Sequence, residues 1–163
     1  MALKLTIVLA MSIFNIFYSQ IIAEKPLGDG TEGDPYRISS LENLWWLSEK
    51  TDETPQPVPE FLAHYIQTND IDATATRDAG GIRQIGKFRH TFRGKYDGQE
   101  HSITGLFLNR QQGFFGWTTR ATIKNLTLID IELVGKGSEV GAVVGRYQGI
   151  LMKNVHVKNG IIS

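Results

Sequence analysis

Gly113-Phe-Phe-Gly-Trp-Thr-Thr-Arg-Ala-Thr-Ile-Lys-Asn-Leu-Thr-Leu-Ile-Asp-Ile131 is the stretch from which the architecture can be worked out, because its pattern returns before the C-terminus. Gly116 and Gly145 each follow two bulky apolar residues, and Lys124 and Lys153 each precede an Asn and an apolar residue. The offset is the same in both cases, from 116 to 145 and from 124 to 153, or 29 residues. A repeat of roughly 20–50 residues is typical of a solenoid, a propeller or an array.

Each copy also contains an alternation that is typical of a β-strand. Leu126-Thr-Leu128 and Val155-His-Val157 place two bulky side chains on one face of a strand and a polar one on the other. A third, weaker copy, His101–Leu108, aligns with them when Ile103 is placed on Ile123, an offset of 20 residues (123 − 103). We therefore expect three inner columns of stacked apolar side chains. These columns are Ile103/Ile123/Met152, Leu106/Leu126/Val155 and Leu108/Leu128/Val157.

Glycine and asparagine discriminate between these architectures. Glycines recur from Gly113 to Gly149 and interrupt any run long enough for a helical array. Short strands joined by Gly- and Asn-rich corners instead predict an all-β fold, a parallel β-helix (β-solenoid), in which each coil needs a neighbour to bury its apolar face. Asn125 and Asn154 occupy matched positions and could form a side-chain hydrogen-bond ladder at one corner, with Gly105 in that position of the third copy.

The segment Val140-Gly-Ala-Val-Val-Gly145, with the flanking pattern Ile123-Lys-Asn-Leu126, resembles the GLUG repeat, which is named for its Gly-Leu-any-Gly core. Three upstream segments resemble the leader that commonly precedes such repeats: Gly30–Leu44, Tyr65–Asp72 and Gly94–Ile103. The resemblance implies a right-handed parallel β-helix in a secreted or surface protein of bacteria. Proteins of this group include large adhesins and some IgA-specific metalloendopeptidases.

Residues 1–23 are predicted to be a secretory signal peptide. Lys4 precedes an apolar run that ends at Tyr18, and the small residues Ser19 and Ala23 offer cleavage points. The alternative, an uncleaved membrane anchor, is disfavoured because polar residues shorten the apolar run below about 20 residues. The chain has no Cys, so it carries no lipoprotein anchor site and no disulfide. We therefore expect a secreted or cell-surface protein that meets the membrane only through its signal peptide.

Residues 24–60 are expected to form an N-terminal segment with a short capping helix over about 40–50. Ser39 and Glu42 have the spacing of a capping box, and the apolar stripe makes Trp45 a core anchor and leaves Trp46 more exposed. The favoured role of this helix is to cover unpaired strand edges at one end of the coils. The alternative is an aromatic platform for a sugar ring. Prolines at 55, 57 and 59 then predict an exposed loop over 51–59.

Residues 61–163 are assigned to the β-helix coils, with GLUG-like repeats at about 113–141 and 142–163. Asp97-Gly98 is typical of a type I′ turn, which predicts a β-hairpin between 91–96 and 101–108. After Val157 the chain continues to Ser163 without a charged or amphipathic capping element. Since terminal coils normally carry a polar cap, we expect either a chain truncated relative to a longer protein or end-to-end stacking with another chain.

No catalytic, cofactor-binding or metal-binding motif is legible in the sequence. The four His residues stand apart, and no phosphate-binding Gly-rich loop is present. Asp70 and Asp72 could act as a carboxylate pair in glycan hydrolysis, but Asx turns at a strand end are the favoured interpretation. A turn rich in oxygen ligands could attract Ca²⁺, but it fits no complete calcium loop, and a solvated acidic turn is favoured. Its polar residues are Asp29, Thr31, Glu32 and Asp34.

The charges of the chain balance, with 17 basic and 17 acidic residues. A formal net charge of 0 predicts no long-range attraction to nucleic acid or to an anionic membrane. Lys124 and Lys153 fall on matched positions of the repeat, where stacked like charges repel each other. Each ammonium group therefore needs an anion, a carboxylate or water, and water is the favoured partner.

These features favour a non-enzymatic, secreted or cell-surface β-helix module, adhesin-like or structural. Its repetitive outer surface would contact a surface glycan or a host or other extracellular protein. A first alternative is a glycan-binding module or the remnant of a polysaccharide-degrading enzyme, with Trp46, Trp117 and Tyr147 as candidate ligand contacts. A second alternative is the N-terminal piece of a larger surface peptidase or adhesin. Nothing in the sequence points to a cofactor or to nucleic acid as a partner.

Overall fold

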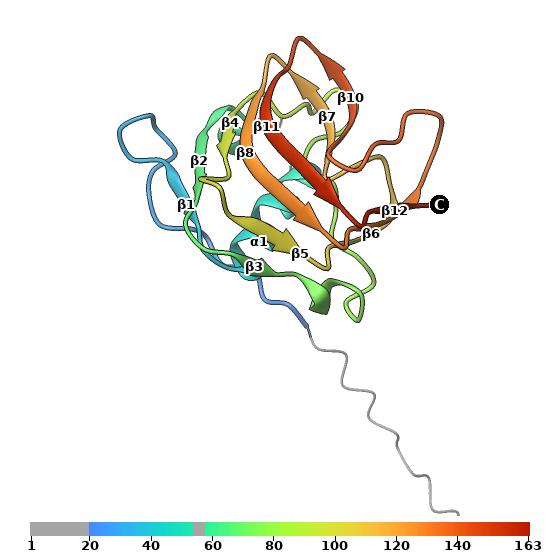
Figure 1. The fold of residues 1–163 in the computed structure, drawn as a ribbon. Helices are drawn as coiled ribbons and strands as arrows, with labels where there is room; N and C mark the ends of the chain where they lie inside the picture. Colours follow the sequence, from blue (N-terminus) through green and yellow to red (C-terminus); the bar gives the residue numbers. More distant parts are fainter. Residues whose placement is uncertain (1–19, 54–57) are drawn as a thin grey trace, which may run out of the picture.

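The computed structural model describes residues 20–53 and 58–163, and Figure 1 shows them as a fold made mainly of strands. The predicted signal peptide therefore lies almost wholly outside the described residues, as does the middle of the Pro-rich loop. Within the described residues the predicted all-β class is confirmed, since strands predominate and one α-helix, α1 (Leu41–Glu49), accompanies them. No helix in this part of the chain is long and apolar enough to cross a membrane.

The strands are short except for two that have eight residues each. In chain order they are β1 (Tyr36–Ile38), β2 (His64–Gln67), β3 (Ile71–Asp72), β4 (Lys95–Asp97), β5 (Ser102–Thr104), β6 (Phe107–Gln111), β7 (Phe115–Thr119), β8 (Thr122–Ile129), β9 (Glu132–Gly135), β10 (Val144–Gln148), β11 (Leu151–Lys158) and β12 (Ile161–Ile162). Three 3₁₀ helices complete the described elements: η1 (Lys50–Asp52), η2 (Pro59–Leu62) and η3 (Thr74–Thr76).

All pairs between these strands are parallel, and they form three sheets. The largest sheet has the order β1-β2-β4-β8-β5-β3, and β11 also pairs with β8. The long strands β8 and β11 run side by side in Figure 1. The other two sheets are β10-β7 and β12-β9-β6.

The 29-residue repeat of the sequence corresponds to the step from one strand to its parallel neighbour. Val144 pairs with Phe115, Met152 with Ile123, and Ile162 with Leu133, one pair from each sheet. Leu126 also pairs with Val155, as predicted. The constant offset across three sheets shows that no residue is inserted or lost between these two copies.

The predicted alignment of the third copy is wrong. Ile103 pairs with Leu128, not with Ile123, and Leu108 pairs with Leu133. Leu106 therefore does not stack on Leu126 and Val155, and its carbonyl instead accepts a hydrogen bond from the Glu132 amide. The residue that pairs with Ile123 on this side is Tyr96 in β4. Apolar matching alone could not detect this, because the corner between β4 and β5 has two residues more than the corresponding part of β8.

The predicted hairpin is also wrong, because β4 and β5 pair with β8 and not with each other. They act as one strand interrupted by a corner, in which Gln99 and Glu100 adopt positive φ angles of 50° and 66°. Gly98 and Glu100 donate their amides to the carbonyls of Lys124 and Asn125. The corner therefore stays hydrogen-bonded to β8 while it accommodates the extra residues.

The predicted asparagine ladder is present. Asn154 Nδ2 donates to Asn125 Oδ1 at 3.2 Å, and Asn125 Nδ2 donates to Asp97 Oδ1 at 2.9 Å. Both asparagines have positive φ, 52° at Asn125 and 54° at Asn154, a conformation that Asn tolerates better than most residues. Asp97, which pairs with Lys124, supplies the third side chain of the ladder, and Gly105 takes no part in it. We call Asp97, Asn125 and Asn154 the corner ladder.

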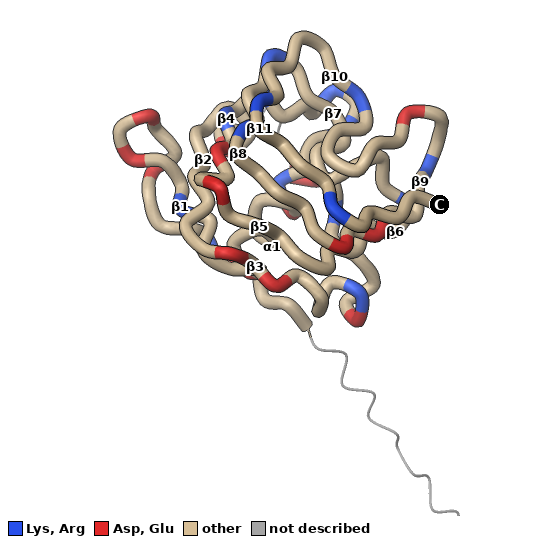
Figure 2. The backbone as a smooth tube through the Cα atoms, in the orientation of Figure 1, with Lys and Arg blue, Asp and Glu red and all other residues tan. Residues whose placement is uncertain are grey.

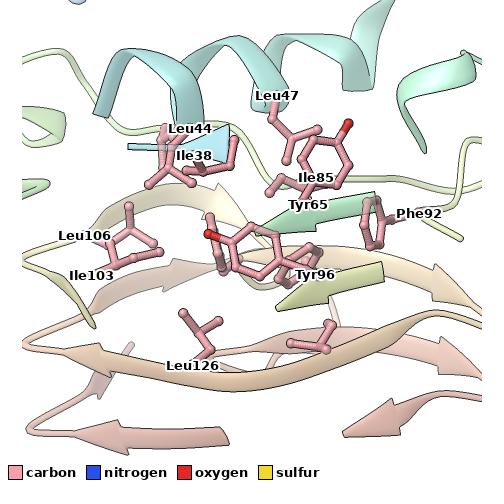
Figure 3. Packing of buried hydrophobic residues seen from close by; sticks show 14 of the residues in the cluster. Ile38, Leu44, Leu47, Tyr65, Ile85, Phe92, Tyr96, Ile103, Leu106 and Leu126 are labelled. Carbon is pink, nitrogen blue, oxygen red and sulfur yellow. The ribbon is translucent and has the colours of Figure 1, made fainter. Parts of the chain in front are cut away.

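A column of aromatic side chains forms much of the core, as Figure 3 shows for Tyr65 and Tyr96 beneath α1. Tyr36, Tyr65 and Tyr96 occupy equivalent positions on β1, β2 and β4, and Ile123 and Met152 continue the same register. Adjacent Tyr ring centroids lie 5.4 and 6.4 Å apart. The Tyr96 hydroxyl donates to Gln67 Oε1 at 3.2 Å, and the Tyr65 hydroxyl donates to the Glu60 carbonyl at 2.7 Å. Burial raises the pKa of both phenols.

Helix α1 packs over this core, and Leu44 and Leu47 point into it in Figure 3. The N-cap is Ser40, one residue later than predicted, and its hydroxyl accepts the Asn43 amide. The predicted burial of the two tryptophans is reversed: Trp46 is buried, with its ring against Tyr36, and Trp45 is half-buried. The prediction failed because the helix is covered on a second side by Tyr36, in addition to the stripe that faces the strands.

Among its described residues, the predicted Pro-rich loop is exposed at Asp52 and Pro59, as expected, but buried at Thr51 and Val58. Thr51 lies within η1 and Val58 directly precedes η2, and each is only 4% exposed. Thr51 Oγ1 donates to the Gln84 carbonyl at 2.7 Å and accepts the Gly86 amide at 3.0 Å. These bonds tie η1, which follows α1 directly, to the segment that leads into the candidate surface described next.

Candidate ligand-binding surface

The three aromatic residues predicted as ligand contacts lie in different environments. Trp46 is 9% exposed and packs against Tyr36, with Lys50 Nζ 4.6 Å from its ring, so it is unavailable to a ligand. Trp117 on β7 is half-buried, and Tyr147 on β10 is 67% exposed. The parallel pairing of β7 with β10 brings the last two close together, because Tyr147 pairs with Thr118.

Trp117 is the centre of a stack of aromatic rings and guanidinium groups. Arg146, its partner across the β7–β10 pair, lies over the Trp117 ring with Cζ 4.5 Å from the centroid. Phe88 approaches Trp117 edge-on from the segment before β4, with centroids 5.1 Å apart. Arg89 Cζ in turn lies 5.2 Å from the Phe88 centroid. We call the two rings Phe88 and Trp117 the aromatic ridge.

The position of Trp117 follows from the alternation of β7. Gly116 and Thr118 are buried on one face of the strand, whereas Trp117 and Thr119 are half-buried on the other, so Trp117 lies on the outer face. The segment on the other side of β7 is held by bridges from Ile85 to Phe115 and from Phe92 to Thr118, and it carries Phe88 between them. Trp117 Nε1 donates to Gln112 Oε1 at 2.6 Å, which fixes the orientation of the indole.

A buried glutamine supports this arrangement from below. Gln84 is 7% exposed, accepts the Gln112 amide at 2.8 Å and donates to the Gly86 carbonyl at 2.9 Å. A Cβ at Gly116 would lie 2.1 Å from Gln84 Nε2, so residue 116 must be glycine for Gln84 to pass beneath β7. The ridge therefore rests on a rigid base.

Two open grooves flank the aromatic ridge. Groove 1, with a volume of about 640 Å³, lies between the ridge, Asp52 in η1 and the end of β6. Groove 2, with a volume of about 470 Å³, lies between the ridge and Tyr147 on β10. Phe88 and Trp117 line both grooves. A ligand that crosses the ridge would therefore contact both.

Cations predominate along both grooves, although the chain as a whole is neutral. Figure 2 shows Lys and Arg positions around β7 and β10, whereas Asp and Glu positions cluster near β3 and in the loop before β1. Among the described residues that line the two grooves, Asp52 is the one carboxylate. The lining cations are Arg83, Lys87, Arg110 and Lys136 in groove 1, and Arg89, Arg93 and Arg146 in groove 2.

Some of these cations are neutralised within the fold and others are not. Asp52 pairs with both Arg83 and Lys87, and Glu139 pairs with Arg146 at 3.0 Å. Among the described residues, the remaining four have no carboxylate within ion-pair distance. They are Arg89, Arg93, Arg110 and Lys136, and all four are exposed. Each groove therefore contains two cations without an acidic partner.

The 29-residue offset of the repeat correctly pairs Trp117 with Arg146, but sequence reasoning missed the rest of this surface. Phe88 and its basic neighbours lie in a segment that the repeat pattern does not cover. The available signal was a local concentration of cations around one aromatic residue, Arg83, Lys87, Arg89 and Arg93 around Phe88. The balanced total charge concealed it.

Other polar groups singled out from the sequence have structural partners. Asp70 Oδ1 accepts the Ser102 amide at 2.8 Å, and this bond is the main reason why the pKa of Asp70 is lowered. Asp72 Oδ1 accepts the hydroxyl and the amide of Thr74, which lower the pKa of Asp72. The predicted Asx turn is therefore confirmed for Asp72, whereas Asp70 bonds to a residue 32 positions later in the chain. No group of three or more His, Cys, Asp or Glu suited to a metal ion occurs within residues 20–53 and 58–163.

The stacked lysines differ from the prediction. Lys124 and Lys153 are paired across β8 and β11, as expected. Lys124 Nζ, however, lies 2.8 Å from Asp97 Oδ2, so a carboxylate and not water is its partner. The acidic turn likewise forms local bonds, with the Thr31 amide on Asp29 Oδ1 at 2.9 Å and Arg37 on Asp34 at 2.6 Å.

Comparison with known proteins yields two long relatives. The chain is 31% identical, over 91% of its length, to a protein of Evansella cellulosilytica whose name describes it as a Gly-rich membrane protein. It is 30% identical, over 76% of its length, to halomucin of Haloquadratum walsbyi. The chain spans 18% of the first relative and 1% of the second. No family model matches the chain, and no solved structure matches it.

Proposed function

We propose that this chain is an extracellular or cell-surface module, without enzymatic activity, that binds a glycan through the aromatic ridge and its two grooves. The observation that carries the proposal is the solvent-open stack Arg89–Phe88–Trp117–Arg146 on a rigid base. Trp117 is held on strand β7 and Phe88 in a turn closed by the bridge between Lys87 and His90, and rings held in place lose little conformational freedom when they bind a ligand. The names of the two relatives, a membrane protein and halomucin, are consistent with a surface location.

The proposal includes a right-handed parallel β-helix of the kind implied by the GLUG resemblance. Its support is the constant 29-residue register in three parallel sheets and the corner ladder. A solenoid tolerates an additional coil, because each coil contacts only its neighbours. A variant in which residues 113–141 are duplicated should therefore fold cooperatively with at least the original stability. Loss of the urea unfolding transition in this variant would contradict the solenoid.

A glycan array with the purified chain tests the binding function. Phe88 is 60% exposed, so Phe88→Ala should leave the stability unchanged while binding of the recognised glycans falls. Leu62→Ala removes an apolar side chain of similar exposure, 53%, on η2 and outside the lining of both grooves, and serves as the control. Absence of any bound glycan, or equal binding by both variants, would refute the proposal. Turnover of a bound polysaccharide would refute its non-enzymatic part.

A second candidate function is structural, through end-to-end stacking of two chains. Strands β10, β11 and β12 each pair on one side only within the described residues. They also expose apolar side chains, with Leu151 58%, Ile161 61% and Ile162 52% exposed. Open strand edges with apolar flanks favour association. Since α1 covers the opposite side of the core, the proposed occupant is the same face of a second copy.

Light scattering on the exported chain distinguishes this arrangement from a monomer. We expect a concentration-dependent dimer that Ile161→Lys converts to a monomer, because an ammonium group cannot be buried in the shared face. Leu62→Lys places the same charge on an exposed leucine elsewhere and should leave the dimer intact. A soluble monomer at high protein concentration would refute the stacking.

A further inference from the structure

We infer that the ligand of the two grooves is an acidic polysaccharide, a linear sugar chain bearing carboxylate or sulfate groups. The inference rests on the proposed binding function and narrows it to one chemical class. The observations that carry it are the two pairs of unpartnered cations, Arg110 and Lys136 in groove 1 and Arg89 and Arg93 in groove 2. A neutral sugar would not require them.

Some cations of the two grooves have a carboxylate partner within the protein and others do not. Asp52 and Glu139 satisfy Arg83, Lys87 and Arg146 within the protein. The four other cations lie on the same surface without a described carboxylate in range, although Arg89 contacts the Phe88 ring and Arg93 donates to Thr91 Oγ1. Their positive charges are therefore not neutralised by any described acidic residue. A guanidinium group binds a carboxylate or sulfate through two parallel hydrogen bonds, and such charge-assisted bonds are stronger than those between neutral groups.

The distribution over two grooves favours an extended chain over a single anion. The unpartnered cations stand on both sides of the aromatic ridge, and the ridge lines both grooves. One small anion could contact only one pair. A polymer with a negative group on each residue could occupy both grooves while its uncharged faces cross Phe88 and Trp117. Several weak contacts along one polysaccharide chain together give a higher overall affinity than any single contact.

The same observations favour a sugar chain over single-stranded nucleic acid. Nucleic-acid platforms present free ring faces on which bases stack. Here Arg146 lies over the Trp117 ring and Arg89 over the Phe88 ring, at 4.5 and 5.2 Å. Phe88 and Trp117 also contact each other at an interplanar angle of 63°. The ridge is thus a packed unit that a chain crosses, rather than a slot for a base.

Calorimetric titration with four matched ligands tests the inference. The ligands are oligogalacturonate, its fully methyl-esterified form, a sulfated oligosaccharide and oligo(dT). The methyl ester keeps the sugar backbone and removes the charge. We expect oligogalacturonate or the sulfated oligosaccharide to bind at least about tenfold more tightly than the methyl ester, with an affinity that falls as NaCl rises.

Charge variants locate the binding. Arg110→Gln with Lys136→Gln, and separately Arg89→Gln with Arg93→Gln, should each weaken acidic-glycan binding by about tenfold or more. The control is Lys153→Gln with Lys158→Gln on β11, which removes the same charge from exposed positions outside both grooves and should change the affinity less than about twofold. Circular dichroism and urea unfolding check that all variants are folded.

The outcomes separate this inference from the proposed function. Equal binding of the methyl ester, unaffected by the groove variants, would overturn the acidic-glycan inference and leave glycan binding in place. Tighter binding of oligo(dT) than of either acidic glycan would overturn the inference in favour of nucleic acid. Binding that the β11 control weakens as much as the groove variants would also overturn it. No binding to any glycan would refute the proposed function itself.

Discussion

Replacing Asn125 by Gly and by Ala separates two contributions of the corner ladder. Asn125 accepts one side-chain hydrogen bond from Asn154 and donates one to Asp97, and its φ of 52° lies in the left-handed region. Gly removes both hydrogen bonds but adopts this conformation freely. Ala removes the same bonds and in addition carries a Cβ in an unfavourable conformation.

The expected magnitudes follow from these losses. The partly buried hydrogen bond to Asp97 contributes about 1 kcal/mol and the exposed bond from Asn154 about 0.5 kcal/mol, so Asn125→Gly should lower the free energy of unfolding by about 1.5 kcal/mol. In Asn125→Ala, backbone strain, offset in part by the greater unfolded-state freedom of glycine, lowers it by about 1 kcal/mol more, to a total of about 2.5 kcal/mol. The same pair of changes at Asn154 should cost less, about 1 kcal/mol for Gly, because the hydrogen bonds of Asn154 are exposed.

Urea unfolding followed by circular dichroism measures these differences, provided that the slope of the transition is unchanged. Equal stabilities of Asn125→Gly and Asn125→Ala would show that the positive φ is not a source of strain. Stabilities of both variants within about 0.5 kcal/mol of the parent would show that the ladder contributes no net stability.

Three further predictions concern acid stability, the helix and the signal peptide. Partial burial alone would raise the pKa of Asp97, but hydrogen bonds from Lys124, Asn125 and Gln99 outweigh it and lower the pKa below the ordinary 3.8. The stability that Asp97 contributes is therefore present above about pH 4 and is lost as the pH falls below it. At pH 6 the parent should be more stable than Asp97→Asn, and the difference in the free energy of unfolding should shrink as the pH is lowered. A difference that stays constant would refute this. In the same urea assay, Trp46→Ala should lower the free energy of unfolding by about 3–5 kcal/mol and Trp45→Ala by clearly less, because of the two only Trp46 is buried. A larger loss for Trp45→Ala than for Trp46→Ala would contradict the packing. Ile21 and Ala23 pack against the core, and the Glu24 amide donates to the Glu42 carbonyl, so these residues should remain in the mature protein. Mass spectrometry of the exported chain should therefore find cleavage near Ser19. An N-terminus at Glu24 would show this prediction to be wrong.

The C-terminal half of the fold could be predicted from the sequence because the last two copies of the repeat differ by no insertion. The 29-residue offset of the side-chain pattern is then also the register of the paired strands, and it correctly predicts the pairing of Lys124 with Lys153. The third copy could not be aligned, since the two extra residues at the corner before β5 break this correspondence. Tyr96, the residue that stacks on Ile123, lies before that corner and has no apolar neighbour of the repeat type.

The candidate site could be predicted only where it lies on the repeat. Trp117 and Arg146 are adjacent because β7 and β10 are successive copies. Phe88 reaches the site through a segment joined to β7 by isolated bridges at Ile85 and Phe92, a path that depends on tertiary contacts and leaves no periodic pattern. The prediction that Trp45 and not Trp46 is buried failed for a related reason. The contact of Trp46 with Tyr36 depends on the position of β1 and not on the apolar stripe of the helix.

The column formed by Tyr36, Tyr65, Tyr96, Ile123 and Met152 is covered at one end and exposed at the other. Tyr36 and Tyr65 lie beneath α1, whereas the same register ends at Met152, which is 44% exposed. In the monomer, amide protons of β11 and β12 should therefore exchange with solvent first, and protection should increase strand by strand toward the helix. Thermal fraying would begin at the last rung and progress inward, so that the Trp46 environment is the last to melt.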